Sequence, residues 1–213
     1  MRKKTSKKIV APVRRRNAAA TREAILVSAR RAFAQAGYDG VGVREIARGA
    51  GVTAMLVNRY FGSKEHLFSE VVAETMRTPV ILTEEFVNSG MPGDVFASAL
   101  VELTEPGATP LDGFLIMVHS ASSKRAAEIG REQIEQYHQR TLASALRGDL
   151  AAERAALALS LVAGFQIMRQ MIGLSPLTEA DPKALVEILG PMFEQLIKGE
   201  RPGGDTPPSA TSQ

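Results

Sequence analysis

Apolar residues recur every three or four positions along most of the chain, and no stretch alternates regularly between apolar and polar residues. The first pattern places apolar side chains on one face of a helix, whereas a half-buried strand needs a period of two. We therefore expect an all-α fold.

Four helices are expected in the N-terminal third of the chain. Their predicted ranges are 21–36, 43–49, 53–61 and 63 onward. Thr21, Thr53 and Ser63 suit the N-cap position because a hydroxyl oxygen can accept a hydrogen bond from a free amide of the first turn. Glycines separate these helices, and glycine readily adopts the left-handed conformation that ends a helix.

Further helices are expected along the rest of the chain. Their predicted ranges are 94–103, 111–120, 124–146, 150–173 and 181–198. The connector between the last two, Leu174 to Leu177, is short, so these helices should form an antiparallel hairpin.

Both ends of the chain depart from this pattern. Residues 1–20 hold only a broken apolar cluster among many charges, and residues 201–213 are rich in proline, glycine and small polar residues. Neither segment has enough apolar surface to offset the entropy lost on ordering. We expect a disordered basic arm at one end and a disordered tail at the other.

The net charge of +3 conceals an uneven distribution. Residues 1–22 carry nine Lys or Arg and no acidic residue, whereas residues 67–213 carry eleven basic and nineteen acidic residues. A basic end on an acidic body indicates that the end binds a polyanion while the body stays clear of it. A merely solubilising extension is the alternative.

Composition excludes several classes of protein. The chain has 45% hydrophobic and 23% charged residues, typical of a globular protein, and no cysteine, which excludes disulfides and thiol chemistry. His119 and His138 alone make a poor metal site, and no cofactor is expected. No phosphate-binding loop or hydrolase motif is present, so we do not expect an enzyme. The longest apolar stretch, Leu157 to Met168, is too short to span a bilayer, and a cytoplasmic location is expected.

Residues 44–61 have the pattern of a helix-turn-helix. Ala47 is small where two helices would cross, and Gly51 can make the turn between them. The second helix would present an outward face made of Thr53, Ala54, Met55, Asn58 and Arg59. Such a helix fits the major groove of B-DNA, with its N-terminal residues nearest the base edges.

Several stretches of this region resemble the DNA-binding domain of the tetracycline-repressor (TetR) family. They are Thr21 to Leu26, Phe33, Gly37-Tyr38, Val43 to Ala47, Gly51 to Thr53 and Asn58 to Glu65. The resemblance implies a ligand-responsive homodimeric transcription regulator, usually a repressor, with about nine helices per subunit. It also implies a helix-turn-helix domain over residues 21–66 and a helical regulatory and dimerisation domain over residues 67–200.

The resemblance implies roles for individual residues. Arg44 is expected to contact a base edge or a phosphate, and Tyr60 and Lys64 are expected to contact the phosphate backbone. Thr53, Ala54 and Met55 would open the recognition helix. Tyr60 is also a candidate for a half-buried core aromatic.

Three positions depart from the family pattern. Gly42 replaces the usual Thr or Ser, Met55 replaces Gly or Pro, and Asn58 replaces a Tyr that touches phosphate. Asn58 can pair with the edge of adenine and Met55 can rest on a thymine methyl group, so we hypothesise specific A·T positions in the operator. Asn58 bound only to phosphate or water is an equal alternative.

The arm can make up for the lost phosphate contacts. Arg14, Arg15 and Arg16 lie shortly before the first expected helix. We expect them to reach the adjacent minor groove or the backbone.

The last two helices are expected to form the dimer interface. The first of them has almost no polar face, so both of its sides must be covered, and the family forms a four-helix interface from this pair. The expected interface residues are Leu157, Leu161, Gly164, Met168, Leu185, Ile188, Met192 and Leu196. A buried helix of a monomer is the alternative.

The family implies a pocket for a small effector, which we expect to be apolar or weakly anionic. Aromatic and Met side chains suit an adaptable apolar cavity. The candidates are Phe96, Phe114, Met117, Tyr137, Phe165 and Met168, and plain core is the stronger reading for each of them taken singly. The competing function is a ligand-independent protein that docks on DNA or serves as a scaffold.

Overall fold

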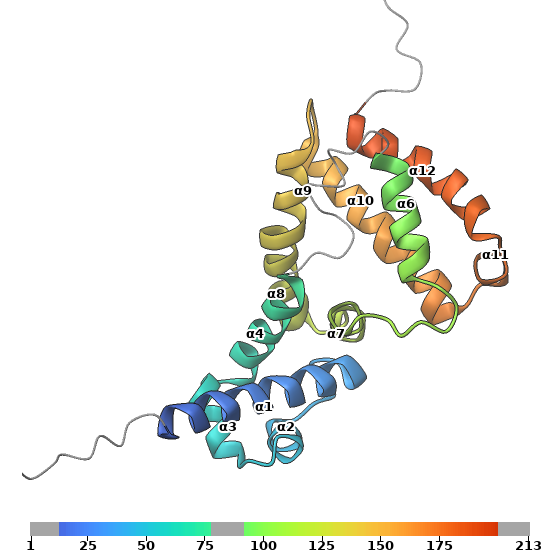
Figure 1. The fold of residues 1–213 in the computed structure, drawn as a ribbon. Helices are drawn as coiled ribbons and strands as arrows, with labels where there is room; N and C mark the ends of the chain where they lie inside the picture. Colours follow the sequence, from blue (N-terminus) through green and yellow to red (C-terminus); the bar gives the residue numbers. More distant parts are fainter. Residues whose placement is uncertain (1–12, 78–91, 200–213) are drawn as a thin grey trace, which may run out of the picture. The chain divides into compact units, whose positions relative to one another are not determined.

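The computed structural model describes residues 13–77 and 92–199, and the regular structure of these residues is entirely helical, as predicted. Two compact units are present. The N-terminal unit contains the residues up to Thr75 together with Asp112–Gly130, and the C-terminal unit contains Met76–Leu111 and the residues from Arg131 onward. Figure 1 labels the helices of both units.

The N-terminal unit is built from six helices or parts of helices in the described chain. They are α1 (Val13–Ala36), α2 (Val43–Gly49), α3 (Ala54–Phe61), α4 (Lys64–Met76), α7 (Asp112–Ser120) and the first part of α8 (Lys124–Ile134). The bounds of α2 and α3 agree with the predicted ranges. Ser63 caps α4 as expected, because its hydroxyl accepts a hydrogen bond from the amide of His66 at 3.1 Å.

The first helix starts earlier than expected. α1 begins at Val13 rather than at Thr21, so Thr21 is not its N-cap, and Arg14, Arg15 and Arg16 lie in its first turn rather than in a disordered arm. The reason is local, because the segment between them and Thr21 is rich in alanine and Arg and Ala have high helix propensity. The rest of the expected arm, residues 1–12, and the expected tail, residues 201–213, lie outside the described residues.

Three aromatic rings form the centre of the N-terminal unit. The Phe68 ring lies 5.1 Å from that of Phe33 and 5.0 Å from that of Tyr38, in edge-to-face geometry both times. Phe33 and Phe68 are completely buried. Burial of each ring stabilises the unit by about 2–3 kcal/mol, which makes this cluster the main anchor between α1 and α4.

Helix α7 packs on α1, although the sequence places it in the regulatory domain. The amide of Tyr38 donates to the hydroxyl of Ser120 at 3.0 Å, and Nδ1 of His119 lies 2.7 Å from the carbonyl oxygen of Ala34. Gly37 has a φ of +66°, and a Cβ there would lie 2.2 Å from the carbonyl oxygen of His119. The expected boundary near residue 66 therefore does not separate the two compact units.

The C-terminal unit contains the remaining elements. They are α6 (Pro92–Leu103), the π-helical segment η1 (Glu135–Gln139), α9 (Arg140–Ala145), α10 (Ala151–Gln166), the π-helical segment η2 (Ile167–Ile172), α11 (Ser175–Thr178) and α12 (Pro182–Lys198). Thus the long helices expected over 124–146 and 150–173 each contain a π-helical segment. The short connector after η2 holds the single turn α11.

Helices α6 and α12 cross closely at two glycines. A Cβ on Gly93 would lie 2.3 Å from the carbonyl oxygen of Gly190, so only glycine fits there. The carboxylate of Glu194 accepts a hydrogen bond from the amide of Gly93 at 2.7 Å, which places a negative charge at the N-terminus of α6. Around this crossing lies the core of the unit, which includes Phe96 and Phe193.

Helices α10 and α12 run antiparallel, as the short connector predicts. Nη1 of Arg154, near the start of α10, donates to the carbonyl oxygens of Leu196 at 3.1 Å and Ile197 at 3.0 Å, near the end of α12. These carbonyls have no partner further along the helix, so the guanidinium caps α12.

Candidate nucleic-acid interface

The turn between α2 and α3 has the geometry that the sequence predicts. Gly42 precedes α2 with φ −100° and ψ 149° and offers no side chain to cap it. After α2, Gly51 has a φ of +67°, and the amide of Val52 donates to the carbonyl oxygen of Ala47 at 2.9 Å. A residue with a side chain would be strained at Gly51, so glycine sets the direction of the chain into α3.

Thr53 caps α3, as expected. Its Oγ1 accepts a hydrogen bond from the amide of Leu56 at 3.3 Å, and its carbonyl oxygen accepts from the amide of Val57 at 3.2 Å. This cap defines which residue begins the helix. It therefore decides which side chains point outward.

Helix α2 is held tightly against α1. The hydroxyl of Ser28 donates to the carbonyl oxygen of Ile46 at 2.9 Å. A Cβ on Gly49 would lie 2.4 Å from that same hydroxyl oxygen. The close approach fixes α2, and through the turn it fixes α3.

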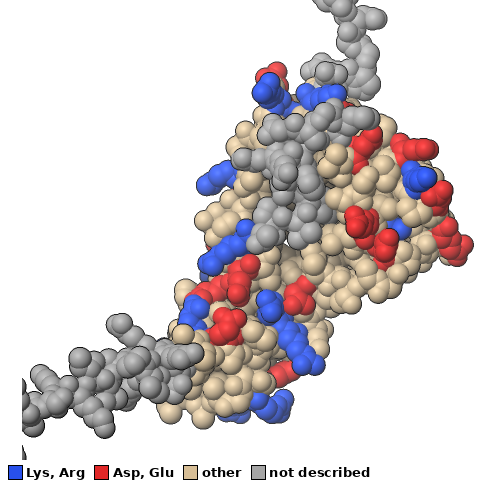
Figure 2. Space-filling view, viewed as in Figure 1, with Lys and Arg blue, Asp and Glu red and all other residues tan. Residues whose placement is uncertain are grey.

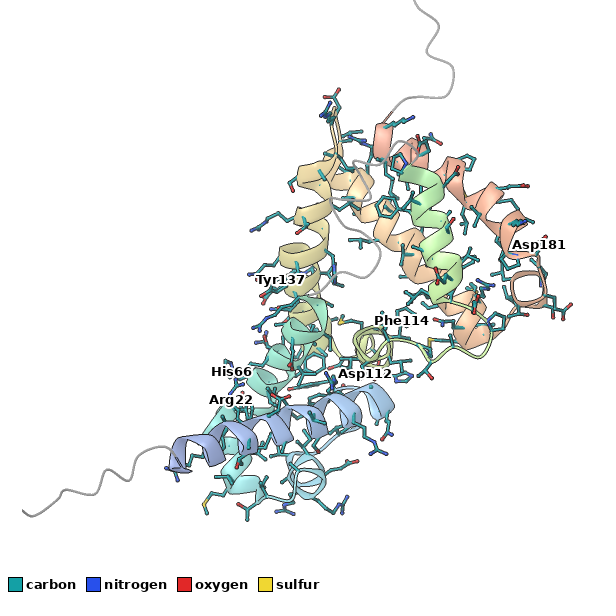
Figure 3. All side chains as sticks on the ribbon, in the orientation of Figure 1. Arg22, His66, Asp112, Phe114, Tyr137 and Asp181 are labelled. Carbon is teal, nitrogen blue, oxygen red and sulfur yellow. The ribbon has the colours of Figure 1, made fainter. Side chains whose placement is uncertain are left out.

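Arg22 joins three helices of the N-terminal unit. Its guanidinium on α1 pairs with the carboxylate of Glu70 on α4 and lies 5.0 Å from the centre of the Phe61 ring at the end of α3. Nε2 of His66 lies 3.2 Å from the same carboxylate. Figure 3 labels Arg22 and His66 in this cluster. These contacts hold the C-terminal end of α3 against α1 and α4.

One face of α3 is buried and the other is open. Val57 and Phe61 are 2% exposed, whereas Met55 is 80% exposed. Thr53, Asn58 and Arg59 are exposed with Met55, and Ala54 is half-buried. The side chains predicted to read DNA therefore lie on the free face of this helix.

Three arginines near this face are free of internal partners. Arg44, Arg48 and Arg59 are exposed, and none of them forms an ion pair with any residue that the structure describes. Arg48 was not among the DNA-contacting residues predicted from the sequence. Its position one helical turn after Arg44 is the signal that could have identified it, because residues four apart share a helix face.

Tyr60 and Lys64 occupy intermediate positions. Both are half-buried, and the ammonium of Lys64 lies 4.2 Å from the centre of the Tyr38 ring. The ring of Tyr60 packs beside Phe61, with 6.4 Å between the ring centres. The Tyr60 side chain is thus held by its ring, whereas Lys64 is held by its ammonium group, and the intermediate burial of both leaves each partly accessible to a phosphate.

Acidic side chains mark a surface that is unsuitable for DNA. Figure 2 shows them gathered on the part of the C-terminal unit formed by α11 and α12, where Glu179, Asp181 and Glu187 are exposed. Phosphates would be repelled from this surface.

The six candidate pocket residues do not share one unit. Phe114 and Met117 lie on α7 in the N-terminal unit, whereas the other four belong to the C-terminal unit, and Figure 3 labels Phe114 and Tyr137 as one example of each. Phe96 and Phe165 are buried in the core of their unit. Met168 is 44% exposed and faces outward. The described residues therefore do not unite these six side chains in a single cluster within one unit.

The expected dimer residues divide into two groups. Leu157, Met168, Ile188 and Met192 are 57%, 44%, 65% and 46% exposed. Leu161, Gly164 and Leu196 are half-buried. Leu185 is only 6% exposed and belongs to the core of the C-terminal unit, so it offers little surface to a partner. It lies on the same stripe of α12 as Leu189 and Phe193, one helical turn apart, and that stripe faces inward.

Helices α10 and η2 together form a long apolar rod. Over Ala151–Ile172 the helix is long and apolar enough to cross a membrane, judged by length and composition alone. In its most apolar 18-residue segment, 28% is buried within the structure. Arg154 and Arg169 lie within the rod and both bond to carbonyl oxygens of the same unit. An apolar rod with an open face is equally what a helix at a subunit interface looks like.

Two family descriptions match the chain, one for each part. Residues 25–71 match the model of bacterial regulatory proteins of the tetR family, and residues 92–197 match the tetracyclin repressor-like C-terminal domain. No protein with a curated description matches the sequence.

Solved structures of the same fold are similar over most of the chain. A putative TetR-family transcriptional regulator from a Rhodococcus species is 15% identical, with a TM-score of 0.61, over 84% of this chain and 100% of its own. NalD, the secondary repressor of the MexAB-OprM multidrug efflux pump in Pseudomonas aeruginosa, is 22% identical, with a TM-score of 0.56, over 85% and 98%. AibR, solved with isovaleryl coenzyme A and operator DNA, is 16% identical, with a TM-score of 0.56, over 81% and 97%.

Proposed function

Because the chain belongs to the tetR family of bacterial regulatory proteins, we propose that it is a cytoplasmic transcription repressor, without enzymatic activity, that binds a palindromic operator as a homodimer and is released by a small effector. The observation that supports this proposal most directly is the open face of α3. An apolar side chain as exposed as Met55, beside Asn58 and Arg59, gains by contact with a partner.

The recognition helix reads bases through its first two turns. Thr53, Ala54 and Met55 lie at its N-terminal end, which enters deepest into the major groove. The side-chain amide of Asn58 can pair with adenine in bidentate fashion, because its Oδ1 can accept from the N6 amino group and its Nδ2 can donate to N7, while Met55 covers a thymine methyl group. We therefore propose A·T pairs at the positions below Met55 and Asn58.

Phosphate contacts fix the position of the helix in the groove. Arg44 and Arg48 on α2 are exposed and unpaired, and Tyr60 and Lys64, at the other end of α3, are half-buried and thus partly accessible to a phosphate. Arginine pairs with phosphate through a planar fork of donors, and each such contact releases counterions. We propose that Arg14, Arg15 and Arg16, in the first turn of α1, add further phosphate contacts.

A second copy of the chain covers the open face of α10, η2 and α12. Leu157, Met168, Ile188 and Met192 are all at least 44% exposed in the isolated subunit. Because about half of each side chain is already covered, burial of the remainder contributes about 1 kcal/mol per residue. A Cβ on Gly164 would meet nothing within 4 Å, so the backbone of α10 can be approached closely. Pairing of two subunits spaces the recognition helices about 34–36 Å apart, as successive major grooves on one face of DNA require.

The effector acts by changing the preferred arrangement of the two recognition helices. A ligand shifts such an equilibrium only as far as its affinities for the two arrangements differ. AibR, which was solved with an acyl coenzyme A and operator DNA, is an example of a similar fold that binds both kinds of ligand.

Selection of bound duplexes from a random DNA pool with the full chain tests the proposal. We expect enrichment of an inverted repeat with half-sites about one helical turn apart. A pool without any enriched inverted repeat would contradict sequence-specific binding and would favour a scaffold that docks on DNA without reading it.

A further inference from the structure

The rod formed by α10 and η2 buries two arginines, and the two differ in how their donors are satisfied. Arg154 is 8% exposed and Arg169 is 3% exposed. In Arg154 all three nitrogens of the guanidinium donate hydrogen bonds: Nε to the carbonyl oxygen of Asp149, Nη1 to those of Leu196 and Ile197, and Nη2 to that of Arg147. Arg154 is thus a completed structural cap.

Arg169 uses only one of its three nitrogens. Nη1 donates to the carbonyl oxygen of Val101 at 2.8 Å and to the hydroxyl of Thr104 at 3.1 Å. Nε is buried and has no hydrogen-bond partner, and Nη2 donates to no residue that the structure describes. The edge of this guanidinium that carries Nε and Nη2 therefore has no hydrogen-bond partner among the described residues.

No carboxylate pairs with Arg169 within residues 13–77 and 92–199. Burial lowers the pKa of its guanidinium, and the negative charge of Glu105 opposes this effect. Arginine keeps its proton in proteins, so the charge remains. The C-terminus of α6, to which Arg169 is bonded, offsets about half a charge only. A buried cation whose donors are partly unbonded lowers the stability of the fold unless an anion pairs with it.

The surroundings of this edge indicate what kind of anion fits. The Nε–Nη2 edge presents two parallel donors, which match the two oxygens of a carboxylate. The Phe165 ring lies 5.7 Å from Cζ of Arg169 and belongs to the apolar core of the unit. Gln170, the next residue along the chain, donates to the carbonyl oxygen of Leu103 at 3.2 Å and leaves its own buried oxygen unpartnered.

We propose that Arg169 is an anion-binding residue, and that the effector is an apolar carboxylic acid whose carboxylate pairs with the Nε–Nη2 edge. This inference rests on the proposed function, because it names the chemical class of the effector. The site lies in η2, where Met168, the preceding residue, belongs to the face that the second subunit covers. An anion bound to Arg169 therefore acts directly on the segment that carries part of the dimer interface.

Calorimetric titration of the full chain with sodium benzoate tests the proposal, with benzamide as the neutral molecule of the same shape. We expect saturable binding of benzoate and at least about tenfold weaker binding of benzamide, since only the anion can use the charged edge. Equal binding of the two compounds, or binding of neither, overturns the proposal.

Two matched variants locate the site. Arg169→Lys keeps the charge but lacks the fork, so it should weaken benzoate binding about tenfold or more. Arg154→Lys, on the same rod, should lower thermal stability and leave benzoate affinity unchanged. If Arg169→Lys does not fold, the side-chain Nε–H signals of the unaltered chain serve instead. The spectrum of Arg154→Lys identifies the Nε–H signal of Arg154, because that signal is missing from it. Benzoate should shift a different arginine signal saturably and leave the Arg154 signal in place. A titration without any such shift overturns the proposal.

Operator binding without benzoate separates this inference from the proposed function. A chain that binds its operator but not benzoate contradicts the anion site alone. A chain that binds benzoate through Arg169 but selects no operator contradicts the proposed function alone.

Discussion

The ammonium of Lys64 lies 4.2 Å from the centre of the Tyr38 ring, and this contact holds the first residue of α4 against the aromatic core of the N-terminal unit. The Tyr38 ring also meets Phe68 of α4 edge to face. Because α3 ends immediately before α4, the same contacts fix the C-terminal end of the recognition helix. Binding and stability of this unit therefore depend on overlapping sets of residues, and variants must be chosen to separate the two.

Replacement of Asn58 by alanine should reduce specific binding. Loss of one bidentate base contact should weaken affinity for the selected operator by about 1–3 kcal/mol and relax the preference at one base pair. Fluorescence anisotropy with the operator and with a scrambled duplex measures both affinities. Gln35→Ala, an exposed change on α1, is the control. Equal loss on the two duplexes would show that Asn58 contacts phosphate only.

Replacement of Arg48 by alanine should weaken binding to every DNA sequence alike. Removal of one phosphate contact lowers the slope of log affinity against log salt concentration by about one unit. Titrations at several salt concentrations give the slope. Arg140→Ala removes an exposed charge from the C-terminal unit and should leave it unchanged. An unaltered slope for Arg48→Ala would exclude this side chain from the interface.

The basic first turn of α1 should contribute to DNA binding as a group. Alanine in place of Arg14, Arg15 and Arg16 preserves helix propensity, so the change should remove charge without unfolding the turn. If each residue contacts a phosphate, the salt slope should fall by about three units. Circular dichroism confirms the helix content. A slope equal to that of the unaltered protein would indicate that this turn lies away from DNA.

A charge at Ile188 should prevent dimerisation. Ile188 is 65% exposed, so Ile188→Glu leaves the subunit core intact but buries a carboxylate in the proposed interface. Analytical ultracentrifugation should then detect monomers, and operator affinity should fall. Glu187→Gln, at the neighbouring exposed position, is the control. A dimer that survives Ile188→Glu would place the interface elsewhere.

Two glycines with the same backbone conformation should respond differently to alanine. Gly37 and Gly51 have φ values of +66° and +67°, but a Cβ on Gly37 would lie 2.2 Å from the carbonyl oxygen of His119, whereas one on Gly51 would meet nothing within 4 Å. Gly51→Ala should cost about 1–2 kcal/mol of unfolding free energy from strain. Gly37→Ala should cost about 1–3 kcal/mol more because of the clash with α7. Urea unfolding measures both, and equal losses would contradict the packing of α7 on α1.

Local features of the sequence were sufficient for the helices and for the turn of the DNA-binding motif. The hydroxyl of Thr53, the glycine at position 51 and the apolar spacing around Val57 act within a few residues of one another. Propensity, capping and periodicity describe interactions at this range, so the outward direction of Met55 and Asn58 could be predicted. The early start of α1 at Val13 was also a local matter, because the charge of the arginines hid a segment of high helix propensity.

Contacts between distant residues were decided only by the tertiary structure. Leu185 and Ile188 are both apolar residues of α12, yet Leu185 is 6% exposed and Ile188 is 65% exposed, because neighbouring stripes of one helix face different partners. Arg154 and Arg169 read as ordinary charges in the sequence, and only the ends of α12 and α6 make them buried donors. The local pattern shows whether a side chain is apolar or charged. Which residue it packs against depends on contacts between segments tens of residues apart, and a local pattern holds no information on these contacts.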